Sequence, residues 1–290
     1  MHLEDALRQG RLLLEESSVP SPRIAAEVLL MYALSCERSH LYAHPERELS
    51  DSERVHYARY LRERMSGKPT QYITGRQEFW SMEFRVTPAV LIPRPETEHV
   101  VERAVELGRQ LAATSQTMDR PVVVDVGTGS GCIAVAVAAE LPRARVIATD
   151  ISAAALALAA ENAARLGVPR VSFCRCDLLA AVATGSAELV LSNPPYVPQD
   201  QAAGLQREIR NFEPQQALLA GPEGTEIYAA LVPEAARVLR PGGWAVFELG
   251  YNMADRVRRL FGPGWQDVEF RPDLAGIPRV ISARRIPVER

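Results

Sequence analysis

The chain has 290 residues, of which 47% are hydrophobic and 24% charged, and its formal net charge is −3. This composition is ordinary for a globular protein, and the length allows one large domain and a small one. The near-neutral charge gives no global electrostatic case for nucleic acid as the main partner. The sequence contains no run of 18 apolar residues and no signal peptide, which predicts a cytoplasmic protein without a membrane segment.

Cysteine and histidine usage argues against a metal centre. The four cysteines fit neither a disulfide framework nor a zinc-binding spacing, and the five histidines all precede the later half of the chain. We therefore expect no metal site and a reducing compartment. The cysteines are Cys36, Cys132, Cys174 and Cys176.

Residues 1 to about 66 are predicted to form helices, and we place a small helical bundle at residues 1–75. Ser21-Pro22 offers a helix start with Pro at the first helical position, and Ser50-x-x-Glu53 matches a capping box. The charges of this segment nearly balance, so it does not resemble a basic arm for nucleic acid. Residues expected on inward helical faces are Leu3, Leu7, Leu14, Ile24, Val28, Tyr32, Val55, Ala58, Leu61 and Met65.

From Phe79 to Val86 the hydrophobic period changes to two, which predicts a half-buried strand. We interpret it as one arm of a β-hairpin linker at residues 76–94. Pro95 suits the first turn of a helix that runs to about Leu111, and Glu96 complements its dipole. Arg94 and Glu98 are open to two interpretations, a functional site or a solvated helix start.

After Pro121 strands and helices alternate, which predicts an α/β domain at residues 95–290 with a parallel sheet and right-handed crossovers. The last two strands are close in sequence, so we expect them to form an antiparallel hairpin. A polar connection is expected at 114–120. Strands are predicted at 122–126, 145–149, 171–176, 189–191, 244–249, 268–270 and 279–283, and helices at 131–141, 152–167, 227–239 and 252–261.

A glycine-rich turn follows the first strand of this domain. Glycines there permit a tight turn and let a ligand approach the backbone closely. A dinucleotide fingerprint would need glycine where Cys132 stands, so the spacing is instead G-x-G-x-G with an acid two residues ahead. The segment is Asp125-Val126-Gly127-Thr128-Gly129-Ser130-Gly131, and it is similar to the loop of class I methyltransferases.

Acidic residues end the next two strands. Asp150 lies 19 residues after Gly131, where a carboxylate can accept hydrogen bonds from ribose hydroxyls. Asp177 ends the third strand and is placed to meet an adenine amino group, with Leu178 beside it to pack on the ring. An acidic strand end can equally be a helix N-cap.

The fourth strand ends in Asn193-Pro194-Pro195-Tyr196. Proline cannot donate to a sheet ladder, so the strand stops here, and the residue before a proline is held extended. The result is a rigid turn with one side-chain amide, backbone carbonyls and one aromatic ring. It suits gripping a flat NH2-bearing group, although a plain strand-ending turn remains the alternative.

Together these motifs resemble the HemK/PrmC-type N5-glutamine methyltransferases that modify peptide chain release factors. The resemblance covers most of the chain and implies a class I methyltransferase fold, Rossmann-like, with a mostly parallel seven-stranded sheet, a small N-terminal helical domain and a linking β-hairpin. The more particular matches are the segment Leu91-Ile92-Pro93-Arg94-Pro95-Glu96-Thr97-Glu98 and the pair Phe212-Glu213-Pro214 with Ala217-Leu218. Leu178 departs from the family, which often carries an aromatic residue there.

The resemblance implies S-adenosylmethionine as methyl donor and the glutamine of the Gly-Gly-Gln tip of class 1 release factors as acceptor. The donor would be held by Gly127, Thr128, Gly129, Ser130, Gly131, Asp150, Asp177, Leu178 and Asn193. Asn193 and Pro194 would accept hydrogen bonds from the acceptor amide and Tyr196 would stack over it, with Pro195 and Arg94 also contacting the substrate. We expect a monomer whose N-terminal bundle docks the release factor.

Two alternatives stay open. The glycine loop and N-P-P-Y also occur in adenine-N6 and guanine-N2 nucleic-acid methyltransferases, which flip a base into such a pocket. That interpretation requires a basic groove or a target-recognition domain, and neither is evident in the sequence. A non-catalytic scaffold would require none of these motifs.

Overall fold

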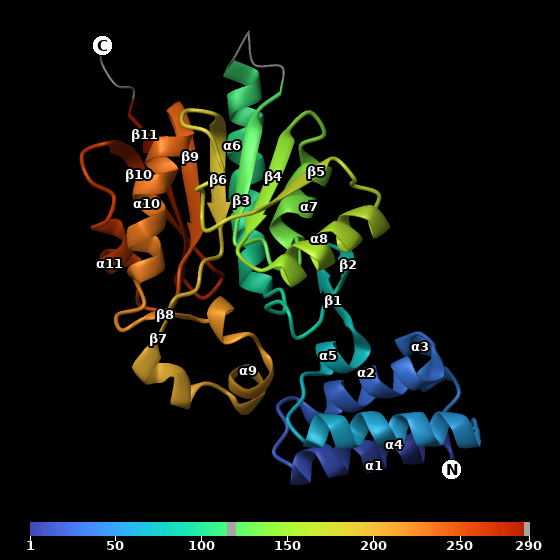
Figure 1. Ribbon diagram of the computed structural model, residues 1–290. Coiled ribbons are helices and arrows are strands. Elements are labelled where there is room, and N and C mark those ends of the chain that lie inside the picture. Colours follow the sequence, from blue (N-terminus) through green and yellow to red (C-terminus); the bar gives the residue numbers. More distant parts are fainter. Residues whose placement is uncertain (115–119, 287–290) are drawn as a thin grey trace. The chain divides into compact units, whose positions relative to one another are not determined.

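The computed structural model describes residues 1–114 and 120–286, so most of the polar connection expected at 114–120 lies outside the described residues. The chain divides into two compact units. The first comprises Met1–Arg76 with Leu205–Phe212, and the second comprises Gln77–Gly204 with Glu213–Arg290. Figure 1 shows a helical first unit and a second unit built on a sheet.

Helices pack around one hydrophobic cluster in the first unit. The predicted capping box is confirmed, because Ser50 Oγ accepts from the Glu53 amide at 3.3 Å and Glu53 Oε2 accepts from the Ser50 amide at 2.8 Å. The helices are α1 (Leu3–Glu16), α2 (Pro22–Leu34), α3 (Arg38–Ala43), α4 (Asp51–Met65) and α5 (Thr70–Thr74).

The inward faces of two of these helices differ from the prediction. Ile24 is 58% exposed and Val55 is 63% exposed, and Ala58 also faces solvent. On α4 the core position is taken by Tyr57, whose hydroxyl donates to the Ala26 carbonyl at 3.4 Å. Residues two apart on a helix point about 200° apart, so burial of this ring turns Val55 outward.

One segment of the first unit comes from far along the chain. Helix α9 (Arg207–Phe212) lies within Leu205–Phe212, between the short strands β7 (Val197–Pro198) and β8 (Leu219–Gly221). The buried guanidinium of Arg64 forms an ion pair with Glu208 and donates to the Lys68 carbonyl at 3.1 Å. No sequence pattern predicts this association, and the segment was expected to belong to the second domain.

The predicted strand at Phe79–Val86 is wrong in its extent, because a complete hairpin occupies this region. Strands β1 (Arg76–Phe79) and β2 (Met82–Arg85) are joined by a two-residue turn. Trp80 and Ser81 both have positive φ, 52° and 56°, as a tight hairpin turn requires. The Trp80 amide donates to Glu98 Oε1 at 2.8 Å, which ties the turn to the start of α6 (Glu98–Thr114).

Seven strands of the described residues form the sheet of the second unit, and the predicted α/β architecture is confirmed. The order is β10-β11-β9-β6-β3-β4-β5, with parallel pairing from β9 to β5. β11 pairs antiparallel with both β9 and β10, as expected for the last hairpin. The strand order reverses between β3 and β6. The strands are β3 (Val122–Val126), β4 (Arg145–Asp150), β5 (Val171–Arg175), β6 (Ala187–Ser192), β9 (Leu239–Glu248), β10 (Trp265–Pro272) and β11 (Pro278–Arg285).

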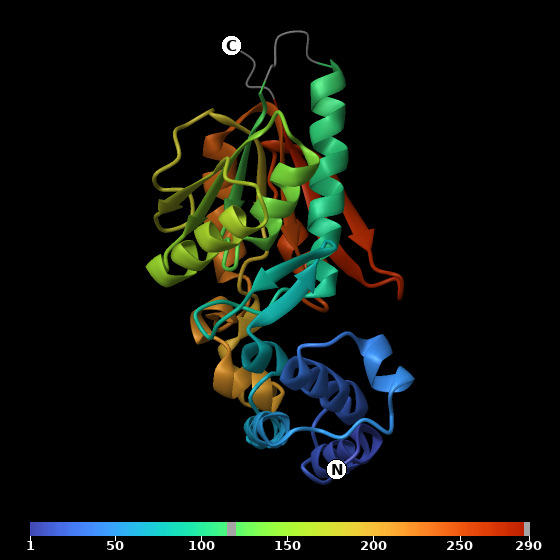
Figure 2. The same ribbon diagram turned by 90° about the vertical axis from the view of Figure 1, so that its right-hand side faces the viewer.

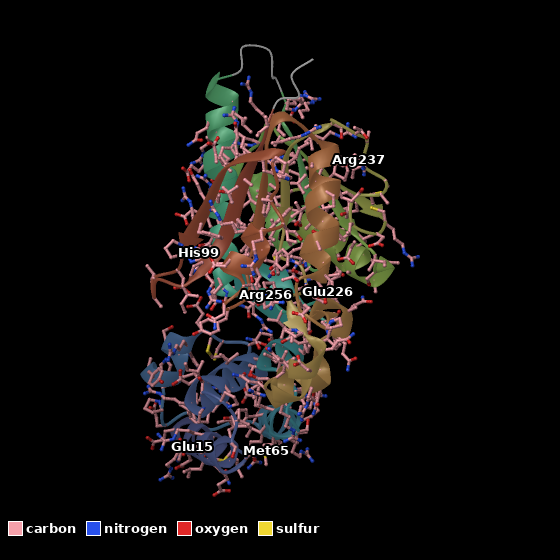
Figure 3. The ribbon with its side chains drawn as sticks, turned by 90° about the vertical axis from the view of Figure 1, so that its left-hand side faces the viewer. Glu15, Met65, His99, Glu226, Arg237 and Arg256 are labelled. Carbon is pink, nitrogen blue, oxygen red and sulfur yellow. The ribbon has the colours of Figure 1, made fainter. Side chains whose placement is uncertain are left out.

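Helices cover both faces of this sheet (Figures 1 and 2). Alternation along β3 sends Val123 to the cluster with α6 and α7, and Val124 to the cluster with α10 and α11. Acidic Glu226 and basic Arg237 lie at opposite ends of α10, where they complement its dipole (Figure 3). The predicted helix at 252–261 is shorter in the structure. The remaining helices are α7 (Cys132–Glu140), α8 (Ala153–Arg165), α10 (Glu226–Val238) and α11 (Ala254–Arg258).

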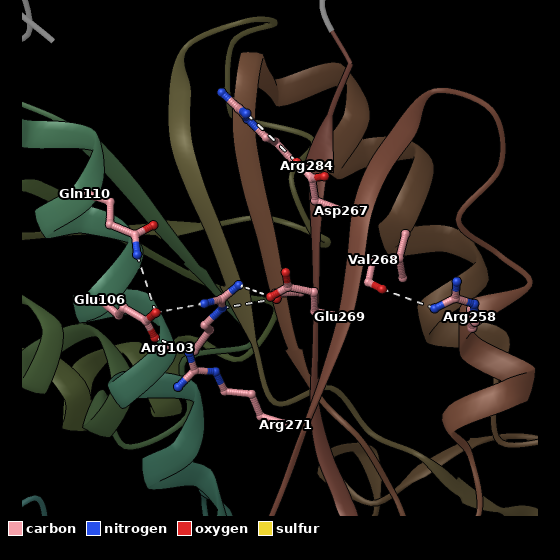
Figure 4. Close-up of polar contacts among 10 residues, drawn as sticks. Arg103, Glu106, Gln110, Arg258, Asp267, Val268, Glu269, Arg271 and Arg284 are labelled. Carbon is pink, nitrogen blue, oxygen red and sulfur yellow. Dashed lines mark hydrogen bonds and ion pairs between the residues drawn. The ribbon is translucent and has the colours of Figure 1, made fainter. Parts of the chain in front are cut away.

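A buried arginine ties the C-terminal hairpin to α6 (Figure 4). Arg103 pairs with Glu269 on β10 at 2.6 Å and with Glu106 on its own helix at 3.2 Å. Glu106 also pairs with Arg271 on β10, so two charged residues of α6 form ion pairs with two charged residues of β10. The network holds β10, at the edge of the sheet, against α6.

Candidate active site

A cavity of about 310 Å³ lies at the carboxyl ends of the central strands, where the strand order reverses. This is where open α/β sheets bind their ligands. Most residues predicted from the sequence line it, whereas Gly131 and Tyr196 do not. Those that do are Arg94, Gly127, Thr128, Gly129, Ser130, Asp150, Asp177, Leu178, Asn193, Pro194 and Pro195.

The glycine loop presents bare backbone to this cavity. Gly127 and Gly129 have φ values of 69° and 55°, and a Cβ atom on either would meet nothing within 4 Å. Gly131, at φ 84°, instead lets α7 pack closely on α8, because a Cβ there would lie 3.0 Å from that of Ala159. The first two glycines therefore leave space for a ligand, and the third serves packing.

Asp150 braces the loop from the end of β4. Its Oδ2 accepts from the Gly129 amide at 2.9 Å and its Oδ1 from the Ser152 amide at 2.8 Å. A carboxylate oxygen has more than one acceptor site, so both can still receive a ribose hydroxyl. The backbone of Leu178 is held in the left-handed region, φ 44°, and its carbonyl accepts from Thr149 at 3.0 Å.

Asp125 lies fully buried at the base of the loop. Its Oδ2 accepts from the Thr128 hydroxyl at 2.6 Å and from the Ala134 amide at 3.2 Å, and burial raises its pKa to about 7. Its Oδ1 has no hydrogen-bond partner among the described residues. The carboxyl groups of Asp150 and Asp177 line the cavity and favour a positively charged ligand. S-adenosylmethionine, which carries a sulfonium and an ammonium group, fits these residues.

The side chain of Asn193 is tied to two buried residues that the sequence analysis did not assign to the site. Asn193 Nδ2 donates to Thr97 Oγ1 at 3.0 Å. The Thr97 hydroxyl donates in turn to Glu248 Oε2 at 2.5 Å. Thr97 lies in the short 3-10 helix η1 (Pro95–Thr97), and Glu248 ends β9. Three segments far apart in sequence thus meet at the Asn-Pro-Pro-Tyr turn.

Tyr196 is partly buried beside the cavity. Its ring packs against Gly250, where a Cβ atom would come within 2.6 Å of the ring. Burial first, and then the nearby Glu248 carboxylate, raise the pKa of Tyr196 to about 12, so its hydroxyl keeps its proton. Its stacking over an acceptor remains a prediction.

Arg94 lines the cavity but is held by a carboxylate. Its guanidinium forms an ion pair with the buried Glu213, whose Oε2 accepts from the Ile92 amide at 3.3 Å. The two segments most particular to the resemblance, Ile92–Glu98 and Phe212–Pro214, are therefore physically joined here. Glu213 was visible only as part of that motif, and Glu248 carried no sequence signal.

No group of histidine, cysteine or acidic side chains within residues 1–114 and 120–286 is placed to hold a metal ion. In the same ranges, no helix has the length and apolar character needed to cross a bilayer. The four cysteines, all within those ranges, are free thiols.

The sheet order and the position of the cavity are those of class I S-adenosylmethionine-dependent methyltransferases, and the chain is an enzyme of that class. The catalytic domain of hMettl16 in complex with MAT2A 3′UTR hairpin 1 has a similar fold. It aligns with a TM-score of 0.54 and 15% identity over 89% of this chain and 93% of that one.

Relatives in sequence define the family. Residues 5–75 match the PrmC N-terminal domain and residues 103–211 match the methyltransferase small domain. A release factor glutamine methyltransferase from Koribacter versatilis is 45% identical over 286 residues, 98% of this chain and 99% of that protein. Another from Nitratidesulfovibrio vulgaris is 42% identical over 288 residues, 98% of this chain and 95% of its own length. The chain belongs to the release factor glutamine methyltransferase family.

Proposed function

We propose that this enzyme methylates the side-chain amide nitrogen, N5, of the glutamine in the Gly-Gly-Gln motif of class 1 peptide chain release factors. The observation that carries the proposal is that Asn193, Pro194 and Pro195 line the same cavity as the glycine loop. Donor and acceptor groups would thereby be recognised side by side. The family relationship supplies the identity of the acceptor.

Gly127–Ser130, Asp150, Asp177 and Leu178 would hold the donor. S-adenosylmethionine supplies an electrophilic methyl group on its sulfonium. The open loop backbone and the acidic strand ends would orient this group, because they offer hydrogen-bond partners along the cavity.

The acceptor amide requires positioning, because delocalisation into the carbonyl makes its nitrogen a poor nucleophile. Asn193 Oδ1 and the Pro194 carbonyl would each accept one of its N–H bonds. These two acceptors favour the positive charge that the nitrogen acquires during transfer. Pro195 and Tyr196 would confine the amide plane, and Arg94, fixed by Glu213, would contact the neighbouring backbone.

We further propose that the enzyme acts as a cytoplasmic monomer and that its first unit docks the body of the release factor. Binding at a distance from the glutamine can contribute to its positioning.

The deciding experiment is incubation with labelled S-adenosylmethionine and, separately, purified release factor, tRNA, rRNA and DNA. We expect label only in the release factor, and none in a release factor whose Gly-Gly-Gln glutamine is changed to alanine. Label in a nucleic acid alone would replace the proposal with the base-methylating alternative. No label in any of the four would favour the scaffold.

A further inference from the structure

Asn193, Thr97 and Glu248 form a hydrogen-bonded chain that leads from the cavity into the protein interior. Asn193 Nδ2 donates to Thr97 Oγ1 at 3.0 Å, and Thr97 donates to Glu248 Oε2 at 2.5 Å. Thr97 and Glu248 are each 2% exposed, so the bond between them is shielded from bulk solvent. Asn193 and Thr97 line the cavity.

Donor and acceptor rules give this chain a direction. An ionised carboxylate can only accept, so the single hydroxyl hydrogen of Thr97 is committed to Glu248. Thr97 Oγ1 then offers only lone pairs to Asn193, and an amide can meet lone pairs only with its NH2 group. The opposite end of the Asn193 amide, the carbonyl oxygen, is left to accept a bond in the cavity. A flipped amide would bring two acceptors together.

We infer that Thr97 and Glu248 are positioning residues that lock the Asn193 side chain in the orientation that accepts an N–H bond from the acceptor. The inference deepens the proposed function and rests on it for the identity of that acceptor. The same orientation accounts for selection of a carboxamide over a carboxylate. The fixed amide oxygen of Asn193 accepts from an N–H group and repels a carboxylate oxygen. The methylated atom must therefore belong to a group that donates.

The lock depends on the charge of Glu248. The groups that interact with it are Glu96, Arg94, Thr97, Cys132, Tyr196, Tyr228 and Arg279. Burial outweighs the favourable arginines and raises the pKa of Glu248 to about 7. A protonated Glu248 can donate to Thr97, which frees the Thr97 hydrogen for Asn193 and makes both amide orientations acceptable. The orientation should therefore be lost as the pH falls below about 7.

The test reads the Asn193 amide directly and needs no substrate. The chain has four asparagines, Asn162, Asn193, Asn211 and Asn252, so asparagine-selective 15N labelling gives a simple NMR spectrum. Asn193→Asp identifies the Asn193 side-chain signal by its loss. In the native enzyme this signal should exchange slowly with solvent and titrate with a midpoint near pH 7. Thr97→Val should make it exchange fast, and Glu248→Gln should abolish its titration.

Turnover supplies the second measurement. Thr97→Val should lower kcat on release factor by roughly 10²-fold with KM for S-adenosylmethionine nearly unchanged, and Thr97→Ser should restore most of the loss. Glu248→Gln should remove the acidic limb of the kcat–pH profile. Tyr228→Phe is the matched control, because its hydroxyl donates at 2.6 Å to the backbone carbonyl of Glu248 and not to the carboxylate. It should leave the Asn193 signal unchanged and kcat within about twofold of native, a change in activation free energy of less than about 0.5 kcal/mol.

Native behaviour of the Asn193 signal in either Thr97→Val or Glu248→Gln would overturn the inference. If Thr97→Val does not fold, Glu248→Gln alone decides it, through the titration of the Asn193 signal. A native enzyme that shows the expected signals but does not methylate release factor would leave the lock standing and remove the proposed acceptor.

Discussion

The side chain of Asp150 accepts hydrogen bonds from the Gly129 and Ser152 amides, and it also lines the cavity. Asp150→Ala should weaken binding of S-adenosylhomocysteine by about 1.5–3 kcal/mol, roughly tenfold to a hundredfold, because charge-assisted hydrogen bonds are lost. Isothermal titration calorimetry measures this. Glu161→Ala, which removes an exposed partner of Arg85 on neighbouring α8, should bind normally. An unchanged dissociation constant for Asp150→Ala would remove this residue from the donor site.

Asn193 should act on turnover and little on folding. Asn193→Ala removes one preorganised acceptor at the reacting centre, which lowers kcat by about 10²–10³. Thermal midpoint and affinity for S-adenosylhomocysteine should move little, as Asn193 is only partly buried. Near-native kcat would contradict its role, and failure to fold would favour the plain strand-ending turn.

Much of the cavity lining could be predicted, because its residues lie at strand ends that sequence patterns reveal. The glycine loop, Asp150, Asp177 and the Asn-Pro-Pro turn all follow apolar runs, and the structure brings them to one cavity. Glu248 also ends a strand, 55 residues after Asn193, but it was missed because no motif surrounds it. Its partner Thr97 was recognised only as part of the segment Leu91–Glu98 and was given no role of its own. Long-range hydrogen bonds leave no periodic signal in a sequence.

At the scale of elements, Glu213 joins the segment before η1 to the segment after α9. Glu213→Ala should lower the free energy of unfolding by about 1–3 kcal/mol, because it leaves the Arg94 guanidinium and the Ile92 amide without their carboxylate. Urea denaturation measures the change. Glu223→Ala breaks the exposed Glu223–Arg256 pair and should cost less than about 1 kcal/mol. Equal costs for the two variants would show that the Arg94 pair contributes no more than a surface pair.

Element types were easier to predict than element faces and ends. The capping box of α4 was confirmed because it depends on residues three apart. The inward face of α4 was wrong because a single aromatic, Tyr57, has more area to bury than Val55. The hairpin turn at Trp80-Ser81 was missed because neither residue favours positive φ, and the tertiary contact with Glu98 supports that turn.

For the whole molecule, two buried carboxyls make stability depend on pH. Burial raises the pKa of Asp125 from 3.8, and of Glu248 from 4.5, to about 7. The folded chain therefore holds protons that the unfolded chain releases between these values. The stability that these groups contribute is present below their ordinary pKa and is lost as the pH rises to about 7.

The corresponding measurement is the thermal midpoint between pH 5 and pH 8. It should fall with rising pH in the native protein and fall less in Asp125→Asn. Asp273→Asn is the control, because Arg279 lowers the pKa of Asp273 and its contribution is lost only in more acidic solution. A native midpoint that rises with pH across this range would contradict the assignment.

The first unit should act as the docking element for release factor. Removing residues 1–76 should leave donor binding near normal but slow methylation of whole release factor, and abolish its preference over a short Gly-Gly-Gln peptide. Glu208→Ala is the matched control: it keeps residues 1–76 but breaks the Arg64–Glu208 ion pair. It therefore separates the effect of docking from the effect of losing that pair. If the truncated enzyme keeps its preference for whole factor, the docking role is wrong.

The assignment of Leu205–Phe212 to the first unit has a consequence for synthesis. Arg64 and Glu208 are 144 residues apart, and a ribosome that adds about 5–20 residues per second takes roughly 7–30 s to make that stretch. During this interval Arg64 cannot form its ion pair with Glu208, because that carboxylate has not yet been translated. The unit that emerges first is therefore completed late, after most of the sheet strands of its neighbour have left the ribosome.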